Sequence, residues 1–361
     1  MITRILFIIS GLGLGNSTRC HAVIQRLQSL QAEVAVATSG NGMWYFDGRP
    51  EIFALHEMKS LYYGRSGDHL SMFQTLLNAG AYVQILRHNK KDLAKILDDF
   101  KPNVAVTDSV YTLAPMRDRK IPVAALNNAD VVHKAYRFFD DTPKSIRAQF
   151  YGIEELDYLF HRKRLDLVLS PTLDHTIPVS SAPYSRIGPI VRKGYGAVEM
   201  TGSPKKVVIM LSGSVFGTPV RLTAAECPVS IEVVGRRAPK GWREDGQIIY
   251  HGRKRETGPI LKDADLVIIN GGFSAVSEIF CMRKPMLVVP VPNHAEQWLN
   301  ARTIKHLGVG DIITEEGLEA AILPALLRIE EFRASYERLP IPDDGAQQAA
   351  ERIVALARSS G

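Results

Sequence analysis

Glycine, hydroxyl and carboxylate side chains stand close together late in the chain, in an order that suits an anionic ligand. Gly271 and Gly272 follow the apolar run Leu266–Asn270, which is typical of a parallel strand covered on both faces. Glycines let the backbone turn sharply and approach a ligand closely. A helix then begins near Ser274, where free N–H groups favour phosphate, and Glu278 lies one turn further on, within reach of a sugar hydroxyl. The pattern predicts a nucleotide-diphosphate site.

A second glycine turn, Gly11 to Gly15, follows the apolar run Arg4–Ser10 near the start of the chain. A strand-to-helix turn of this kind can cradle phosphates, so dinucleotide binding has to be considered. However, the spacing is GxGxG rather than GxGxxG, and the next predicted strand ends in AVATSG without an acidic residue for a ribose. We therefore do not expect NAD or FAD.

Two further turns of small or polar residues follow predicted strands in the second half of the chain. Ser212, Gly213 and Ser214 could donate N–H and hydroxyl groups to a phosphate or to a sugar, although a plain strand-to-helix turn would look the same. His251 and Gly252 end another predicted strand on the same side of the sheet. These residues extend the candidate site beyond the central motif.

The central motif resembles a known family. It resembles the donor-binding signature of GT-B glycosyltransferases. The nearest groups are the MurG-like N-acetylglucosaminyltransferases and the UDP-glycosyltransferases. The matching residues are Gly271-Gly272-Phe273-Ser274, Ser277-Glu278, Lys284-Pro285, Glu296-Gln297 and Asn300-Ala301. The signature covers about a tenth of the chain. The ordered combination is more specific than a lone GG-x-S would be.

The resemblance implies a role for each matched residue. Ser274 and the amides after Gly272 would bind the diphosphate, and Glu278 the ribose hydroxyls. Glu296 and Gln297 would bind hydroxyls of the donor sugar. The region of His251 and Gly252 would contact the nucleobase, partly through backbone groups.

The resemblance also places the N-terminal glycine turn, with Gly13, Gly15 and Asn16, on the acceptor side. The family often has a histidine where this chain has Asn16. An inverting transfer needs a base for the proton of the acceptor hydroxyl, and an asparagine amide can orient a hydroxyl but is not a useful base near neutral pH. The donor-binding residues therefore match the family, whereas transfer needs a base other than Asn16.

Other residues remain as candidates for the missing base. Asp108 follows the predicted strand Val104–Thr107 at the carboxyl end, where parallel sheets place their chemistry, and matches the family's strand-end aspartate. It could act as base or orienting acid together with Asn16, or it could instead cap a helix. Asp130 and His133 follow the next strand, in a predicted loop that could line the acceptor pocket.

The expected function is an inverting, metal-independent glycosyltransferase that uses a nucleotide sugar, most simply a UDP-sugar, as co-substrate and needs no cofactor. No DxD-type pair stands at a strand end, and Asp140-Asp141 lies in a polar loop, so a helix N-terminus and basic residues such as Arg19 and Arg253 would stabilise the leaving group. Two alternatives stay open, namely a nucleotide-sugar hydrolase or epimerase of the same fold, and a catalytically silent nucleotide-sugar binding protein.

The elements that must position these residues alternate between strand and helix. The alternation predicts an α/β protein of two doubly wound, Rossmann-like domains, and the resemblance implies the GT-B arrangement, in which the two parallel sheets face each other across a cleft. We expect an acceptor-binding domain at 1–192, a linker at 193–206 and a donor-binding domain at 207–345. A C-terminal helix at 346–361 could pack back on the first domain.

Length and composition fit this prediction. The chain has 361 residues, 45% hydrophobic and 23% charged, as in an ordinary soluble protein of two domains. Three widely spaced cysteines indicate neither a disulfide framework nor a metal site, so we expect a reduced, cytoplasmic protein. The net charge of +6 is mild, and no basic tract with interleaved aromatic residues indicates nucleic acid.

Two segments combine aromatic and basic residues, Leu61–Phe73 and Arg137–Arg164. Such a surface could recognise a lipid-linked acceptor at the inner face of a membrane, although ordinary acceptor-side loops with core aromatics would have the same composition. The acceptor is therefore either a small molecule or lipid-linked. No apolar run reaches the roughly 18 residues of a membrane span.

Overall fold

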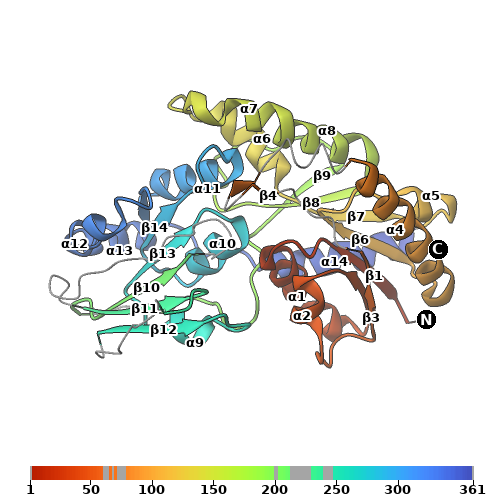
Figure 1. The fold of residues 1–361 in the computed structure, drawn as a ribbon, viewed down its shortest axis with the longest axis horizontal. Coiled ribbons are helices and arrows are strands. Elements are labelled where there is room, and N and C mark those ends of the chain that lie inside the picture. Colours follow the sequence, from red (N-terminus) through yellow and green to blue (C-terminus); the bar gives the residue numbers. More distant parts are fainter. Residues whose placement is uncertain are drawn as a thin grey trace.

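The computed structural model of the chain consists of two α/β units, each built around its own parallel sheet (Figure 1). It describes residues 2–59, 65–66, 69–70, 79–198, 202–211, 229–238 and 247–359. Ser212, Gly213 and Ser214 lie outside these residues, as does most of the stretch 61–73. Within the described chain, none of the helices combines the length and the apolar composition that a bilayer span requires.

The sheet of the first unit has seven strands, and every neighbouring pair is parallel. Their order across the sheet is β3-β2-β1-β6-β7-β8-β9. The strands are β1 Arg4–Ile9, β2 Glu33–Thr38, β3 Ala54–Glu57, β6 Val104–Asp108, β7 Val123–Leu126, β8 Leu167–Pro171 and β9 Tyr184–Ile187. A separate antiparallel pair consists of β4 Arg65–Ser66 and β5 His69–Leu70.

The sheet of the second unit has six parallel strands in the order β12-β11-β10-β13-β14-β15. The strands are β10 Lys206–Met210, β11 Ser230–Val234, β12 Ile248–Gly252, β13 Leu266–Asn270, β14 Met286–Val289 and β15 Gly310–Ile312. Near-continuous apolar runs such as LVIIN in β13 are buried because helices cover both faces of the sheet. The two sheets confirm the predicted α/β class with two doubly wound units.

Helices connect the strands and cover both sheets (Figure 1). Those of the first unit are α1 Leu14–Leu27, α2 Asn41–Phe46, α4 Ala79–Phe100, α5 Ala114–Asp118, α6 Ala129–Phe138, α7 Arg147–Gln149 and α8 Glu155–Arg164. Shorter turns are η1 Gln28–Leu30, η2 Lys144–Ile146 and the π-helical η3 Phe150–Glu154. The later helices are α9 Gly258–Lys262, α10 Phe273–Cys281, α11 Ala295–His306, α12 Leu318–Leu327, α13 Ile329–Arg338 and α14 Gly345–Ser359.

Both sheets reverse their strand order beside their first strand, between β1 and β6 and between β10 and β13. In open parallel sheets, ligands bind outside the carboxyl ends of the strands at such a switch point. Asp108 pairs in register with Ile9, and the Ser10 amide donates to the Asp108 carbonyl at 3.0 Å. The N-terminal glycine turn and the end of β6 are therefore held side by side.

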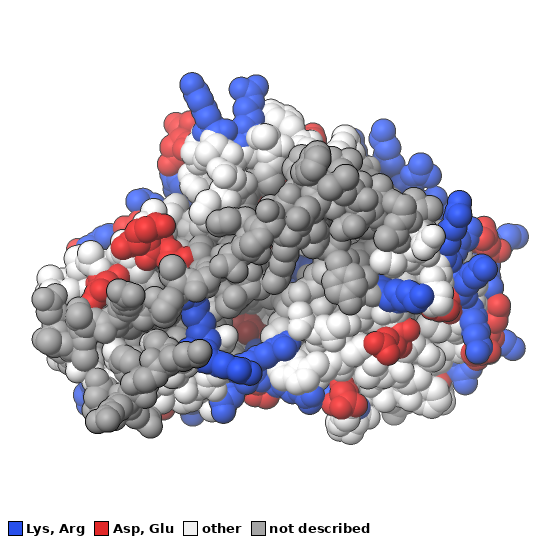
Figure 2. All heavy atoms as spheres, in the orientation of Figure 1, with Lys and Arg blue, Asp and Glu red and all other residues white. Residues whose placement is uncertain are grey.

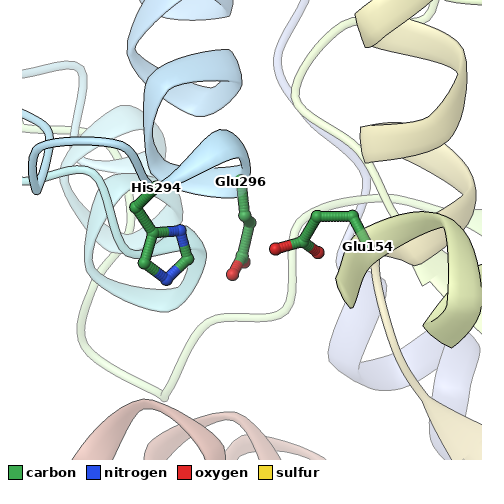
Figure 3. Close-up of side chains that lie close together, drawn as sticks. All are labelled: Glu154, His294 and Glu296. Carbon is green, nitrogen blue, oxygen red and sulfur yellow. The ribbon is translucent and has the colours of Figure 1, made fainter. Parts of the chain in front are cut away.

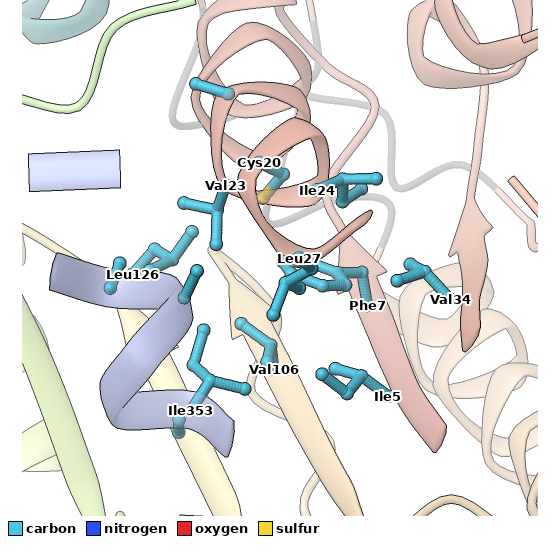
Figure 4. Close-up of a cluster of buried hydrophobic side chains, with 14 of the residues drawn as sticks. Ile5, Phe7, Cys20, Val23, Ile24, Leu27, Val34, Val106, Leu126 and Ile353 are labelled. Carbon is cyan, nitrogen blue, oxygen red and sulfur yellow. The ribbon is translucent and has the colours of Figure 1, made fainter. Parts of the chain in front are cut away.

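The last helix, α14, returns to the first unit and packs against its sheet. Ala350 and Ile353 are fully buried in the cluster that contains Ile5, Phe7 and Val106 (Figure 4). The Gly345 amide at the start of α14 also donates to the Pro189 carbonyl at 3.2 Å. The core of the first unit is thus completed by residues from the far end of the chain.

Shortening Ile353 to alanine should destabilise the first unit, because it opens a cavity between α14 and the sheet. We expect Ile353→Ala to lower the free energy of unfolding by about 2–5 kcal/mol in a urea titration. Glu351→Ala, on the exposed side of the same helix, is the control, with an expected change within about 0.5 kcal/mol. Equal losses in the two variants would contradict the packing described here.

Candidate active site

The two glycine turns at the switch points of the two sheets meet at the junction between the units. Ser274, in the first turn of α10, donates its hydroxyl to the Gly15 carbonyl at 2.9 Å. A Cβ atom added to Gly15 would lie 3.5 Å from the Ser274 Oγ, which is an ordinary contact. The N-terminus of α10 and the N-terminal glycine turn therefore border the same place.

Gly271 and Gly272 serve different purposes in the turn before α10. A Cβ atom on Gly271 would lie 2.4 Å from the Gln297 carbonyl oxygen. This position must therefore be glycine for the two backbone segments to pack together. Gly272 has an ordinary φ of −66°, and an added Cβ would have no neighbour within 4 Å among the residues that the structure describes. Within the part of the chain that the structure describes, Gly272 therefore leaves room beside the helix N-terminus for a ligand to approach the free amides.

Side chains of α11 hold the turn that contains Gly271 and Gly272 in place. Asn300 donates its side-chain amide to the Gly271 carbonyl at 2.9 Å. Gln297 accepts a hydrogen bond from the Val291 amide at 3.1 Å, which leaves its NH₂ group without a hydrogen bond within the described chain. Two residues matched to the family signature, Asn300 and Gln297, therefore hold this turn and the segment before α11 in place.

Glu278 lies in a buried ion pair with Arg192. The Arg192 Nε donates to Glu278 Oε1 at 2.7 Å and Nη2 to Oε2 at 3.1 Å, and both side chains are almost fully buried. The remaining Arg192 donors contact Tyr195 Oη, the Arg255 carbonyl and Glu256 Oε2. The sequence reasoning missed Arg192, because a single arginine after an apolar pair carries no local signal.

Asp108 is also paired with an arginine. The Arg19 Nε donates to Asp108 Oδ2 at 2.9 Å and its Nη2 to Oδ1 at 2.7 Å, while the Cys20 thiol lies 3.4 Å from Oδ2. The Asn16 side chain accepts a longer bond from Arg19 at 3.5 Å. The two residues predicted as catalytic are therefore brought together, with Arg19 as the group between them.

Asp130 and His133 lie in helix α6 rather than in the expected loop. Asp130 is fully buried and accepts from the Ser180 amide at 3.2 Å. The His133 Nδ1 lies 2.6 Å from Glu155 Oε2, and its ring stacks on Tyr158. Their contacts join α6 to α8 and to the Ser180 loop, not to the N-terminal glycine turn.

His251 and Gly252 end β12, as predicted. The His251 Nε2 lies 2.8 Å from Glu232 Oε2, and Lys206 pairs with the other oxygen of Glu232 at 2.7 Å. Gly252 has a φ of +62°, in the left-handed region that favours glycine. The backbone therefore changes direction here, at the carboxyl end of the strand.

Carboxylates from the two units face each other at the junction. Glu296 opens α11 and accepts from the Asn128 side-chain amide of the first unit at 3.0 Å. Glu154 from η3 points toward it (Figure 3). Burial, and then the nearby Glu296 carboxylate, raise the pKa of Glu154 to about 8. No sequence signal singled out Glu154.

Basic residues join the units on another side of the junction. The Arg253 guanidinium lies 4.0 Å above the Trp44 ring, that of Arg255 4.6 Å above it, and Arg253 donates to Asn41 Oδ1 at 2.8 Å. Figure 2 shows basic side chains where the two halves of the molecule meet. Elsewhere on the viewed face, acidic and basic side chains are interspersed.

Comparison with known sequences identifies related proteins. Residues 3–329 match the family described as Glycosyl transferase family 1. An uncharacterized glycosyltransferase of Methanosarcina mazei is 26% identical, over 93% of this chain and 93% of that protein. A protein of Lachnoclostridium phytofermentans is 24% identical, over 82% of this chain and 83% of that protein. That protein is named UDP-N-acetylglucosamine--N-acetylmuramyl-(pentapeptide) pyrophosphoryl-undecaprenol N-acetylglucosamine transferase.

Solved structures show the same architecture. The chain is similar to MurG of Acinetobacter baumannii with a TM-score of 0.58 and 13% identity, covering 99% of both chains. It is similar to the glycosyltransferase SsfS6 of Streptomyces sp. SF2575, complexed with thymidine diphosphate, with a TM-score of 0.62 and 16% identity, again covering 99% of both chains. These likenesses concern the fold, and they confirm the predicted GT-B architecture.

The two glycines before α10 should respond differently to alanine. Gly271→Ala should lower the free energy of unfolding by about 1–3 kcal/mol, because the new methyl group overlaps the Gln297 backbone. Gly272→Ala should change it by less than about 1 kcal/mol, because nothing described is in contact and φ is ordinary. Chemical denaturation of both variants checks this, and a reversed ranking would contradict the geometry.

The raised pKa of Glu154 predicts a pH-dependent stability. Between about pH 4.5 and pH 8 the unfolded chain has lost this proton while the folded chain keeps it, so the contribution of Glu154 to stability falls as pH rises. Glu154→Gln removes this dependence. Urea unfolding with a chelator present should show the variant gaining stability relative to the unsubstituted protein from pH 5 to pH 8. Glu351→Gln, on the exposed side of α14, is the control.

Proposed function

The chain belongs to the family described as Glycosyl transferase family 1, and we propose that it transfers a sugar, with inversion, from a UDP-sugar to an acceptor. The observation that carries the proposal is the meeting of the two glycine turns at Ser274 and Gly15. In this arrangement the donor binds the second unit and the acceptor the first. The diphosphate then lies at the N-terminus of α10, beside Gly272.

We assign the other donor contacts by resemblance to the family. Glu278 binds the ribose hydroxyls, which is compatible with its ion pair because a carboxylate has about four lone-pair sites and Arg192 uses two. Glu296 and Gln297 bind the donor sugar. His251 and Gly252 contact the base, and Ser212, Gly213 and Ser214 the distal phosphate or the sugar. Support for a nucleotide comes from the thymidine diphosphate held by the similar SsfS6, and for uridine from the name of the L. phytofermentans relative.

Asp108 and Asn16 are our candidates for handling the acceptor hydroxyl. Because both oxygens of Asp108 accept from Arg19, we favour for Asp108 the role of orienting acid, which fixes Arg19 beside Asn16. We propose that the α10 N-terminus and basic side chains stabilise the leaving diphosphate without a metal ion. The second unit then holds the donor while the first supplies the polar groups opposite it.

A cavity in the first unit is suited to a polar acceptor. It has a volume of about 550 Å³ and is lined by Gly40, Glu57, Lys59, His88 and Asp92, among others. Asn41, the residue after Gly40, donates its backbone N–H to the Gly11 carbonyl at 3.1 Å. The cavity therefore adjoins the N-terminal glycine turn. The carboxylates of Glu57 and Asp92 can accept hydrogen bonds from the hydroxyl groups of such an acceptor, and Lys59 can donate to them.

A lipid-linked acceptor is the alternative to a free one. The segment of η3 and α8 leaves three large apolar or aromatic side chains about half exposed, namely Tyr151 at 48%, Ile153 at 54% and Leu156 at 59%. Basic residues of the same region include Lys144 and Arg147. We propose that this face touches an anionic membrane surface when the acceptor is a lipid.

UDP binding tests the donor half of the site. Isothermal titration should show UDP binding that Gly272→Ala weakens by about tenfold, or ~1.4 kcal/mol, because the added methyl group stands where the diphosphate approaches the amides. Glu278→Gln should weaken binding too, whereas Glu351→Ala on α14 should not. Unchanged UDP binding in both Gly272→Ala and Glu278→Gln would refute the donor assignment.

Turnover assays separate transfer from its rivals. The protein is incubated with UDP-N-acetylglucosamine and other UDP-sugars, with and without a panel of acceptors, and UDP release and sugar products are measured. Product that depends on an added acceptor supports transfer. Product without any acceptor supports a hydrolase or epimerase, and tight binding without turnover supports a silent binding protein, which is the reading that Asn16 motivates.

A further inference from the structure

Three side chains with metal-binding atoms converge where η3 of the first unit meets the start of α11. They are Glu154, His294 and Glu296, and one ligand atom from each lies within 4.8 Å of the other two. Figure 3 shows the Glu154 carboxylate pointing toward that of Glu296, with the His294 ring beside it. One ligand therefore comes from the first unit and two from the second.

The two carboxylates lack a cationic partner. Among the ion pairs of the described residues, none joins a lysine or arginine to Glu154 or Glu296. Arg19 interacts with Glu296 only through its charge, because its guanidinium donates hydrogen bonds to both oxygens of Asp108. Glu154 is only 8% exposed, and burying a carboxylate without a counter-charge is costly.

The histidine adds an independent observation. The His294 Nδ1 is buried and has no hydrogen-bond partner within the described part of the chain. Buried polar atoms normally have a partner, and an unpaired one calls for a bound group. Neutral imidazole offers a lone pair, which is a common metal ligand.

Neighbouring amides orient both carboxylates. Gln149 Nε2 donates to Glu154 Oε1 at 2.6 Å, and Asn128 Nδ2 donates to Glu296 Oε1 at 3.0 Å. Gln149 is itself fixed, because its Oε1 accepts from the Ala295 amide at 2.9 Å. Hydrogen bonds to a ligating side chain hold it in place, and here they leave the other oxygen of each carboxylate available to an ion.

We propose that Glu154, His294 and Glu296 bind a divalent transition-metal cation that joins the two units. One nitrogen and two carboxylate ligands suit Zn²⁺ or Mn²⁺. Ligand atoms about 2.1 Å from such an ion lie about 3–3.5 Å apart, so a contraction of under about 2 Å, within the rotamer freedom of two glutamates, completes the site. The ion would connect η3 to α11, in addition to the hydrogen bond between Asn128 and Glu296.

This cation site lies apart from the leaving-group contacts at α10 and shares only Glu296 with the proposed contacts to the donor sugar. Binding of the ion does not depend on sugar transfer. Its test therefore needs neither a nucleotide sugar nor a measurement of activity. A failed turnover assay would leave the cation site standing, and a failed metal titration would leave the donor site standing.

The full-length protein, freed of metal with a chelator and desalted, is titrated separately with Zn²⁺ and with Mn²⁺ in a calorimeter, and bound Mn²⁺ is also followed by electron paramagnetic resonance. We expect saturable binding of one ion per chain. Glu154→Gln should weaken binding by about tenfold or more, since loss of a ligand costs at least as much as loss of a side chain that hydrogen-bonds to a ligand. Glu155→Gln is the matched control, because Glu155 contacts His133 and Arg137 instead.

Three outcomes would overturn the proposal: no saturable binding of either ion, equal affinity in Glu154→Gln, or loss of binding in Glu155→Gln alone, which would place the ion at His133. Circular dichroism checks that each variant is folded. If Glu154→Gln does not fold, His294→Ala replaces it, because His294 lies in a partly exposed turn before α11. The same loss of about tenfold is expected there.

Discussion

The buried ion pair between Arg192 and Glu278 is the interaction on which the junction depends. Removing two charges from water costs several kcal/mol per ion, and this cost is offset only when the geometry is good and the other donors are satisfied. Arg192 meets this condition with five hydrogen bonds to four residues. Because Arg192 lies in the segment that connects β9 to β10 and Glu278 lies in α10, the pair holds this segment against the helix whose N-terminus reaches the Gly15 turn.

Local features of the site could be predicted from sequence. Parallel strands covered on both faces have to be apolar throughout, and a turn that passes close to another backbone has to contain glycine, so β13, Gly271 and α10 each leave a pattern within a few residues. Gly271 shows this directly, because the Gln297 backbone occupies the space of a side chain. The order of the elements then implied the two sheets.

Charge pairing could not be predicted in the same way. Arg192 and Glu278 are 86 residues apart, and Arg19 and Asp108 are 89 apart, so neither pair leaves a local pattern. A carboxylate beside a glycine turn looks the same in sequence whether it is free or held by an arginine. Glu154 was missed for the same reason, since its environment is set by α11, which lies far along the chain.

The return of α14 to the first sheet links the two ends of the chain. Ala350 and Ile353 complete a core that otherwise consists of residues from the first half, such as Ile5 and Val106. During synthesis the first unit therefore keeps an apolar groove uncovered until the residues of α14 have also been made. Folding of the first unit is therefore coupled to synthesis of the second, whose sequence lies between the two parts of this core.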